Sequence, residues 1–119
     1  MDKGGYIYIM TNKSRTTLYI GVTADLKRRI WEHRMHYDIH SFTAKYNLEY
    51  CVYYESFPDI TQAIERETKL KKWRREKKNA LINEMNPHWE DLWVLISERL
   101  NSCFVGQGCL DKLDMTELH

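Results

Sequence analysis

Hydrophobic and polar residues alternate in two short segments near the N-terminus, residues 6–10 and 18–22. Alternation with a period of two is typical of a β-strand that buries one face. The polar residues between the two segments suit a hairpin loop, so we expect these strands to pair antiparallel. Residues 48–57, with the run Cys-Val-Tyr-Tyr at their centre, predict a further strand.

Helical segments are expected after these strands. The predicted helices are residues 23–35, 59–73, 79–85 and 88–100. Thr23 is the expected N-cap of the first helix, and Asp59 or Thr61 that of the second. Residues 36–47 are mixed in character and are expected to form a loop. The pattern predicts an α+β fold, in which helices pack against a small, largely antiparallel sheet.

A chain of 119 residues is long enough for one domain with a single modest core. We assign residues 1–100 to this domain and residues 101–119 to an irregular acidic tail, which we expect to be dispensable for chemistry. The sequence has no apolar stretch of membrane-spanning length and no secretory signal, so we expect no membrane partner and a cytoplasmic location. The cysteines are odd in number and lack the C-x-x-C spacing, which predicts free thiols and no structural zinc. They are Cys51, Cys103 and Cys109.

The formal net charge of +1 conceals a division of charge along the chain. Residues 1–83 carry 16 Lys or Arg against 10 Asp or Glu, whereas residues 84–119 carry 2 against 7. The densest basic cluster is Arg66–Lys78, with eight Lys or Arg and two acids. Such runs are often solvated helix faces, but a basic face is also what a nucleic-acid-binding protein needs. The residues expected to contact phosphates are Lys69, Lys71, Lys72 and Arg75.

Several phenols are predicted to share one face of the sheet. Period-two geometry puts Tyr6, Tyr8 and Met10 on one face of the first strand, and Tyr19 and Gly21 on one face of the second. The other face is aliphatic. Tyrosine is common in sheets and glycine can simply end a strand, but glycine also lets a phosphate or another backbone come close.

Polar residues on two predicted helices border apolar faces. Arg29 and His33 are four residues apart and flank the apolar stripe of the first helix, so both can point at one place beside the sheet. A histidine there can equally be a structural residue. Glu67 lies on the apolar face of the second helix, where a carboxylate needs a partner. A salt bridge to Arg29 or Lys71 and a metal ion are equally compatible with this position.

The order and spacing of these residues resemble the GIY-YIG nuclease domain, over roughly residues 5–93. The matching residues are Tyr6-Ile7-Tyr8, Tyr19-Ile20-Gly21, Arg29, His33 and Glu67. Tyr6 departs from the motif's name, since the family often has glycine there. The chain is most similar to the short stand-alone bacterial members, which tend to carry segments like its AIERETKLKKWRREKK and NPHWEDL.

The resemblance implies a three-stranded antiparallel sheet flanked by helices and hydrolysis of nucleic-acid phosphodiester bonds with one divalent ion, Mg²⁺ or Mn²⁺, held by Glu67. It implies that Tyr8, with its pKa lowered by a nearby cation, is the general base. Tyr19 would position the phosphate or the water, and Arg29 would neutralise charge on the phosphoryl oxygens. His33 would orient Tyr8 or relay its proton. Asn86 is a further candidate, at the position of a late asparagine in the family.

Other functions remain compatible with the sequence. The same basic surface can bind DNA or RNA without cutting it, as a non-catalytic module. The chain can also be an interaction protein that uses Trp89 and Trp93, although we expect these to pack the last helix at positions i and i+4. We expect a monomer that acts on DNA rather than RNA with low sequence specificity, because phosphate contacts carry no base information.

Overall fold

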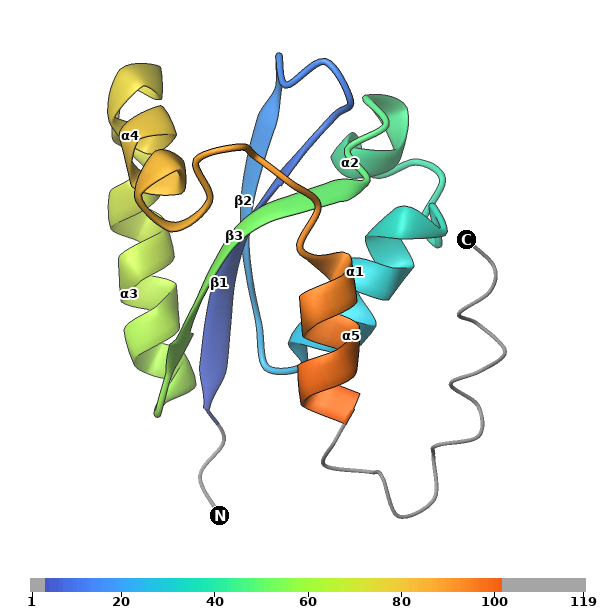
Figure 1. The fold of residues 1–119 in the computed structure, drawn as a ribbon. Helices are drawn as coiled ribbons and strands as arrows, with labels where there is room; N and C mark the ends of the chain where they lie inside the picture. Colours follow the sequence, from blue (N-terminus) through green and yellow to red (C-terminus); the bar gives the residue numbers. More distant parts are fainter. Residues whose placement is uncertain (1–3, 102–119) are drawn as a thin grey trace.

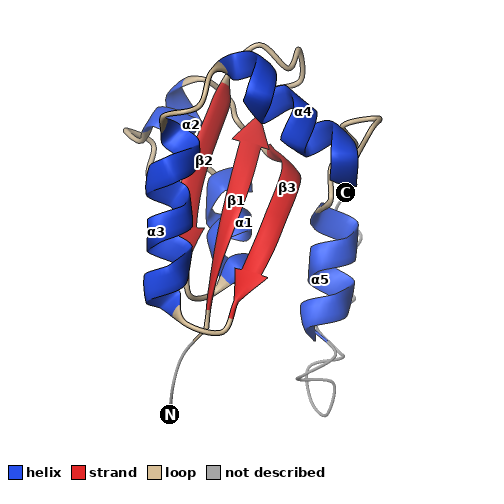
Figure 2. Ribbon diagram, turned by 90° about the vertical axis from the view of Figure 1, so that its left-hand side faces the viewer, coloured by secondary structure: helices blue, strands red, loops and turns tan. Residues whose placement is uncertain are grey.

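A three-stranded antiparallel sheet forms the centre of the computed structural model, which describes residues 4–101 (Figure 1). β1 (Gly5–Thr11) lies between β2 (Leu18–Thr23) and β3 (Tyr50–Phe57) and pairs antiparallel with both (Figure 2). The α+β class and the three-stranded antiparallel sheet are therefore confirmed. Each strand begins and ends within two residues of its predicted bounds.

Helices cover both faces of the sheet. They are α1 (Leu26–Arg34), α2 (Phe42–Lys45), α3 (Ile60–Lys71), α4 (Arg75–Met85) and α5 (Trp93–Asn101). Figure 1 shows α3 and α4 on one side of the sheet and α1 and α5 on the other. No helix within residues 4–101 is long and apolar enough to cross a membrane.

The two faces of the sheet differ in chemistry, as the alternating pattern predicts. On the α3 side, Ile7 and Ile9 of β1 are fully buried in one hydrophobic cluster with Ala63 and Leu70 of α3. Burying an aliphatic side chain of this size stabilises the fold by about 1.5–3 kcal/mol. This cluster fixes α3 against the sheet and determines which side chains of β1 point away from it.

The opposite face carries the phenols. Tyr8 and Met10 of β1 are fully buried there in a second cluster, with Leu26 and Ile30 of α1 and Ile96 of α5. Tyr8 is therefore both a core residue and a candidate site residue, and its hydroxyl is reached from α1.

Helix α1 begins later than the sequence predicts. Thr23 belongs to β2, where it pairs with Tyr6, and the N-cap is Asp25, whose carboxylate accepts the backbone N–H of Arg28 at 3.2 Å. The expectation of Thr23 as N-cap is wrong because β2 needs Thr23 in the sheet. Its hydroxyl instead accepts the backbone N–H of Asp25 at 3.0 Å. The second cap prediction is correct for one of its alternatives, Asp59.

The basic stretch Arg66–Lys78 is not one helix. α3 ends at Lys71, and α4 begins at Arg75, earlier than the predicted residue 79. Between them, Trp73 packs against the buried cluster on the α3 side of the sheet. The break places the basic residues of this stretch on two separate helices.

Residues 86–92 cross from one face of the sheet to the other. Trp89 packs on the α3 side, whereas Trp93 packs on the Tyr8 side. The prediction that both tryptophans lie on one helix is wrong, because Trp89 has a φ of 53°, which interrupts a helix. Asp91 holds the crossing in place by accepting the backbone N–H of Cys51 on β3 at 3.2 Å and by pairing with Arg34 of α1.

Candidate active site

Tyr8 occupies space that only a glycine on the neighbouring strand leaves open. Gly21 of β2 pairs directly with Tyr8 of β1, and the Tyr8 ring lies across it. A β-carbon on residue 21 would lie 2.5 Å from Cζ of Tyr8, closer than real β-carbons approach, and would make a tight contact of 3.0 Å with Cε2 of Tyr19. Gly21 is therefore required for the position of Tyr8 rather than for a backbone conformation.

His33 connects Tyr8 to α2 through its two ring nitrogens. Nε2 of His33 lies 2.9 Å from the hydroxyl of Tyr8, and Nδ1 lies 2.8 Å from Oγ1 of Thr43. Thr43 is buried and lies 3.1 Å from Oγ of Ser41, the N-cap of α2. The loop predicted for residues 36–47 thus contains a short helix that holds His33. Sequence reasoning missed Thr43, since no motif marks it and its role depends on a contact between two separate segments.

The imidazole of His33 is neutral near pH 7. Burial lowers the pKa of His33 to about 4, and the positive charge of Arg29 lowers it as well, against a smaller opposing effect of Glu32. A neutral ring with its proton on Nδ1 donates to Thr43 and leaves Nε2 to accept the hydroxyl proton of Tyr8.

The hydroxyl of Tyr8 is protonated in this environment. Burial raises the pKa of Tyr8, and the nearby Tyr19 raises it further, while the charge and hydrogen bonding of Arg29 lower it less. The expectation that a cation lowers the pKa of Tyr8 is therefore wrong in its net direction, because burial outweighs Arg29. Tyr8 consequently needs an acceptor for its own proton before it can remove one from water, and His33 is placed to be that acceptor.

Tyr19 and Arg29 complete the cluster on this face of the sheet. The ring of Tyr19 lies edge-on to His33, with centroids 5.7 Å apart, and its centroid is 6.3 Å from that of Tyr8. Arg29 lies one turn before His33 on α1, is 44% exposed and pairs with Glu32 at 3.3 Å. The structure thus brings together Tyr8, Tyr19, Arg29 and His33, with a guanidinium that both touches solvent and acts on Tyr8.

Glu67 lies on α3, which packs against the opposite face of the sheet. Its carboxylate pairs through Oε2 with Lys71 at 3.1 Å, which is one of the two salt bridges that the sequence allowed. Arg66 reaches across to Glu55 on β3, and Glu67 lies on the other side of the buried stripe of α3. Glu67 therefore faces away from β3, towards the edge strand β2 that carries Tyr19.

The donor set suits one hydrated hard cation. Residues 4–101 contain no group of three or more His, Cys, Asp or Glu side chains that could hold a metal ion together. Mg²⁺, however, commonly keeps several waters and binds one or two protein carboxylates together with substrate phosphates. The side chain of Glu67 is 16% exposed, so its carboxylate can supply one such ligand at the sheet edge.

Asn86 has a structural role in this structure. Its amide nitrogen donates to the backbone oxygens of Val52 and Glu90, at 3.1 and 2.8 Å, and its amide oxygen accepts the backbone N–H of Glu90 at 3.0 Å. The side chain is buried and fastens the end of α4 to β3. These contacts use its amide for the fold rather than for a substrate.

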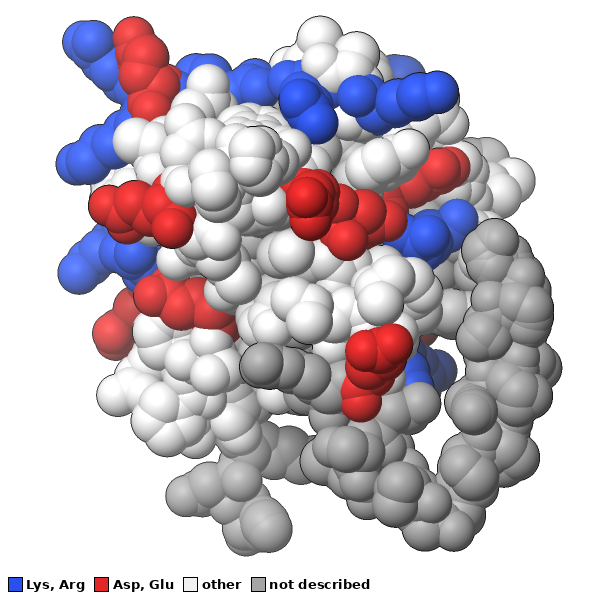
Figure 3. Space-filling view, in the orientation of Figure 1, with Lys and Arg blue, Asp and Glu red and all other residues white. Residues whose placement is uncertain are grey.

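Positive charge gathers around the α3–α4 side and along the edge that holds the β1–β2 loop. Figure 3 shows Lys and Arg there, with Asp and Glu between them across the middle of this face. Lys69 and Lys72 are exposed, while Lys71 pairs with Glu67. Arg75 donates to the backbone oxygens of Arg15 and Thr16, at 2.8 and 3.0 Å. Contrary to the sequence-based expectation, Arg75 thus holds the loop instead of being free for phosphate.

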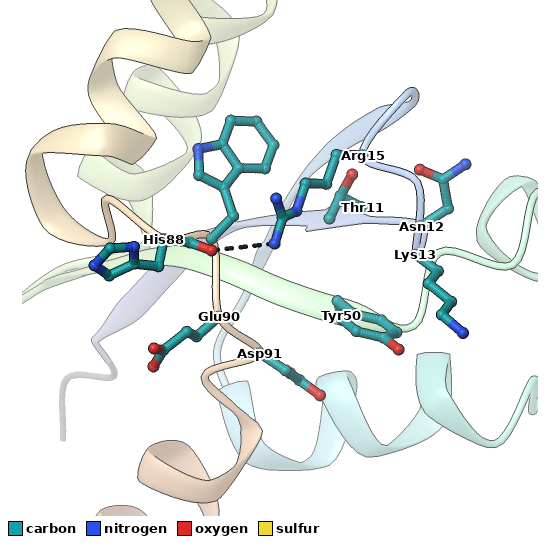
Figure 4. A pocket seen from close by; sticks show the side chains of 9 residues that line it. Thr11, Asn12, Lys13, Arg15, Tyr50, His88, Glu90 and Asp91 are labelled. Atoms are coloured by element: carbon teal, nitrogen blue, oxygen red, sulfur yellow. Dashed lines mark hydrogen bonds between the residues drawn. The ribbon is translucent and has the colours of Figure 1, made fainter.

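A separate small cavity lies between the β1–β2 loop and residues 86–92, which we call the crossing segment (Figure 4). It has a volume of about 250 Å³ and is lined by the indole of Trp89 and by polar and charged side chains, among them Lys13 and Asp91. Arg15 bridges it by donating to the backbone oxygen of His88 at 3.2 Å. None of the clustered residues around Tyr8 lines this cavity. We therefore regard it as a gap between the β1–β2 loop and residues 86–92 and not as part of the candidate site.

The fold and the cluster around Tyr8 point to one domain family, and the comparisons agree. The chain belongs to the GIY-YIG family, since the family model of the GIY-YIG catalytic domain matches residues 4–80. A UPF0213 protein of Haloquadratum walsbyi (strain DSM 16790 / HBSQ001) is 34% identical over 84 residues, which cover 71% of this chain and 92% of the relative. A UPF0213 protein of Bacillus pumilus (strain SAFR-032) is 29% identical over 85 residues, covering 71% and 86%. No solved structure matches the chain significantly.

Proposed function

We propose that the protein is a metal-dependent nuclease that hydrolyses phosphodiester bonds of nucleic acid, with DNA as the expected substrate. The observation that carries this proposal is the hydroxyl of Tyr8, 2.9 Å from Nε2 of a neutral His33 and acted on by the charge of Arg29. A core tyrosine needs only a satisfied hydroxyl. A hydroxyl joined to a proton acceptor beside a partly exposed guanidinium suits proton transfer next to a phosphate.

In the proposed reaction, Tyr8 and His33 act as one base. A water molecule loses a proton to the hydroxyl oxygen of Tyr8 while Tyr8 passes its own proton to Nε2 of His33. The resulting hydroxide attacks phosphorus, and the bond from phosphorus to the leaving oxygen breaks. The proton held by His33 then returns through Tyr8 to the departing oxygen or to solvent. The raised pKa of Tyr8 disfavours a free phenolate, and the lowered pKa of His33 makes it a weak proton acceptor, so the transfer has to be concerted with the attack of the water.

Arg29 and Tyr19 act on the phosphate. The guanidinium of Arg29 is partly exposed and permanently charged, so it can neutralise the charge that grows on the phosphoryl oxygens. Tyr19 lies against both Tyr8 and His33 and would place the phosphate or the attacking water. Both sit on rigid elements, as accurate positioning requires.

One divalent cation, Mg²⁺ or Mn²⁺, would be held by Glu67. When bound, such an ion supplies positive charge that stabilises the transition state and the leaving oxygen. Glu67 contributes a carboxylate at the β2 edge, where it pairs with Lys71. Low sequence specificity, action as a monomer and a cytoplasmic location are part of the proposal.

The test is a Mg²⁺-dependent cleavage assay on labelled single-stranded, duplex and branched DNA and on RNA, with the Tyr8→Phe variant. This variant removes only a hydroxyl, so it should fold normally and cleave about 100- to 10,000-fold more slowly. Tyr54→Phe is the matched control, because Tyr54 faces Tyr8 across the β1–β3 pair. Binding without cleavage by the wild-type protein would favour the non-catalytic binding module. A Tyr8→Phe rate within about threefold of wild type would exclude Tyr8 as the base.

A further inference from the structure

Three aromatic rings form a continuous row that leads out of the Tyr8 cluster. Tyr19 stacks on Phe42, with ring centroids 6.0 Å apart and an angle of 29° between the planes. Phe42 contacts Tyr46 of the same short segment, with centroids 4.7 Å apart. We call Tyr19, Phe42 and Tyr46 the aromatic row. Its inner end touches His33, and its outer end lies on the surface.

The outer rings expose much apolar surface. Phe42 is 47% exposed and Tyr46 is 43% exposed, although Phe42 begins α2 and Tyr46 is its C-cap, and the buried Thr43 of this helix holds His33. The sequence around α2 therefore places one side chain in the site and leaves two aromatic side chains partly exposed to solvent. Solvent-exposed rings at this spacing are suited to stacking with flat ligands.

A positive charge accompanies the outer ring. Nζ of Lys45 lies 5.5 Å from the ring centroid of Tyr46, so an ammonium group stands beside the exposed aromatic surface. Stacked aromatic rings next to a cation are how proteins bind single-stranded nucleic acid, with bases on the rings and phosphates at the charge. Paired bases in a duplex present no free face to such a surface.

We propose that the aromatic row binds an unpaired nucleobase beside the phosphate that is cut, so that the preferred substrate is a single strand or an unpaired region. This inference rests on the proposed nuclease function, because it names the substrate of the same site. We infer a nucleobase as the ligand because the aromatic row begins at Tyr19, which we place at the phosphate that is cut. A neighbouring nucleotide of the same strand would then lie over Phe42 and Tyr46.

The test measures binding without cleavage, in EDTA, by fluorescence anisotropy. The probes are a short single-stranded oligodeoxynucleotide, the same strand with abasic positions, and a duplex. The variant is Phe42→Leu combined with Tyr46→Leu, which keeps apolar bulk on α2 but removes the ring faces. Tyr37→Leu is the control, since Tyr37 is 70% exposed and lies outside the aromatic row. Thermal melts show whether each variant remains folded.

We expect the double variant to bind the intact single strand about 5- to 150-fold more weakly, the range that loss of one stacked base gives. Its affinity for the abasic strand and the duplex should stay at the wild-type level. Equal losses on all three probes, or no loss on the intact strand, would overturn the proposal. A cleavage assay separates this proposal from the proposed nuclease function. If the wild-type protein cleaves DNA but binding does not depend on the aromatic row, only the base-binding surface is refuted. If binding depends on the aromatic row but the wild-type protein does not cleave, only the nuclease function is refuted.

Discussion

A methyl group at position 21 would compete with the ring of Tyr8 for the same space. We predict that Gly21→Ala destabilises the protein by about 1–3 kcal/mol, as overpacking does, and displaces Tyr8 enough to reduce cleavage. Urea denaturation and the cleavage assay measure the two effects. In a Tyr8→Ala background the same substitution should cost little, because the ring that it meets is gone. Equal costs in both backgrounds would show that backbone strain, and not Tyr8, demands the glycine.

His33 should make stability depend on pH in a defined window. Its pKa is about 4 in the folded protein and 6.5 when unperturbed, so between these values the unfolded chain binds the extra proton. Stability contributed by this group is complete above pH 6.5 and is lost as the pH falls towards 4. We predict that His33→Gln flattens this part of the stability profile in urea melts. His88→Gln, at an exposed position, is the control and should follow the wild type.

Individual residues differ in how far the sequence determines them. Tyr8, Tyr19 and Gly21 follow from strand alternation, and His33 from helical spacing, because both depend only on local geometry. Thr43 could not be found this way, since its contact with His33 joins segments whose approach is set by tertiary packing. The direction of the pKa shift of Tyr8 was also out of reach, because it depends on how much water the fold excludes.

The turn between α3 and α4 divides the basic residues into two kinds. Lys69 and Lys72 project into solvent at the end of α3, whereas Arg75 at the start of α4 is hydrogen-bonded to the β1–β2 loop. We predict that Lys69→Ala combined with Lys72→Ala weakens nucleic-acid binding alike across sequences and lowers the log–log salt slope by about two.

Arg75→Ala is the matched comparison for those lysines. It should leave the salt slope nearly unchanged and lower the unfolding free energy by about 0.5–1.5 kcal/mol, since it removes hydrogen bonds that hold the loop. Titrations at several salt concentrations, together with urea melts, separate the two outcomes. A large change in salt slope for Arg75→Ala would place it back among the phosphate contacts.

Boundaries of elements were less predictable than their existence. The helix at the end of the chain was expected from residue 88, but the positive φ of Trp89 and the hydrogen bonds of Asp91 delay it to Trp93. Likewise, Thr23 pairs with Tyr6 in the sheet, so α1 begins only at Leu26. In each case the sequence correctly predicts a helix, but a tertiary contact changes the residue at which that helix begins.

The two faces of the sheet must cooperate if Glu67 holds the metal, since it comes from α3 and the tyrosines from the opposite layer. We predict that Glu67→Gln abolishes cleavage at all practical Mg²⁺ concentrations, because it removes the charge but keeps the size. Nucleic-acid binding should be unchanged or tighter. Stability should change little, because the partner Lys71 is 54% exposed and can be solvated.

The outcome for Glu67→Gln distinguishes a metal ligand from a structural ion pair. Cleavage at the wild-type rate, or a lower melting temperature as the only defect, would assign Glu67 to the fold alone. Lys71→Gln serves as a control that breaks the same pair while keeping the carboxylate, and it should retain Mg²⁺-dependent cleavage. The readouts are cleavage rates across a Mg²⁺ titration and thermal melts of both variants.

The crossing segment, residues 86–92, leads the chain to residues that the GIY-YIG domain needs but that lie outside the matched region. The region shared with the family ends at residue 80, and it already contains Tyr8 and Glu67. Leu92 and Ile96, which seal the hydrophobic layer around Tyr8, lie beyond it. A fragment trimmed to the shared region would keep the reactive groups but leave Tyr8 open to water, without the burial that raises its pKa. Any fusion or transplant of this domain therefore has to carry the chain through Ile96.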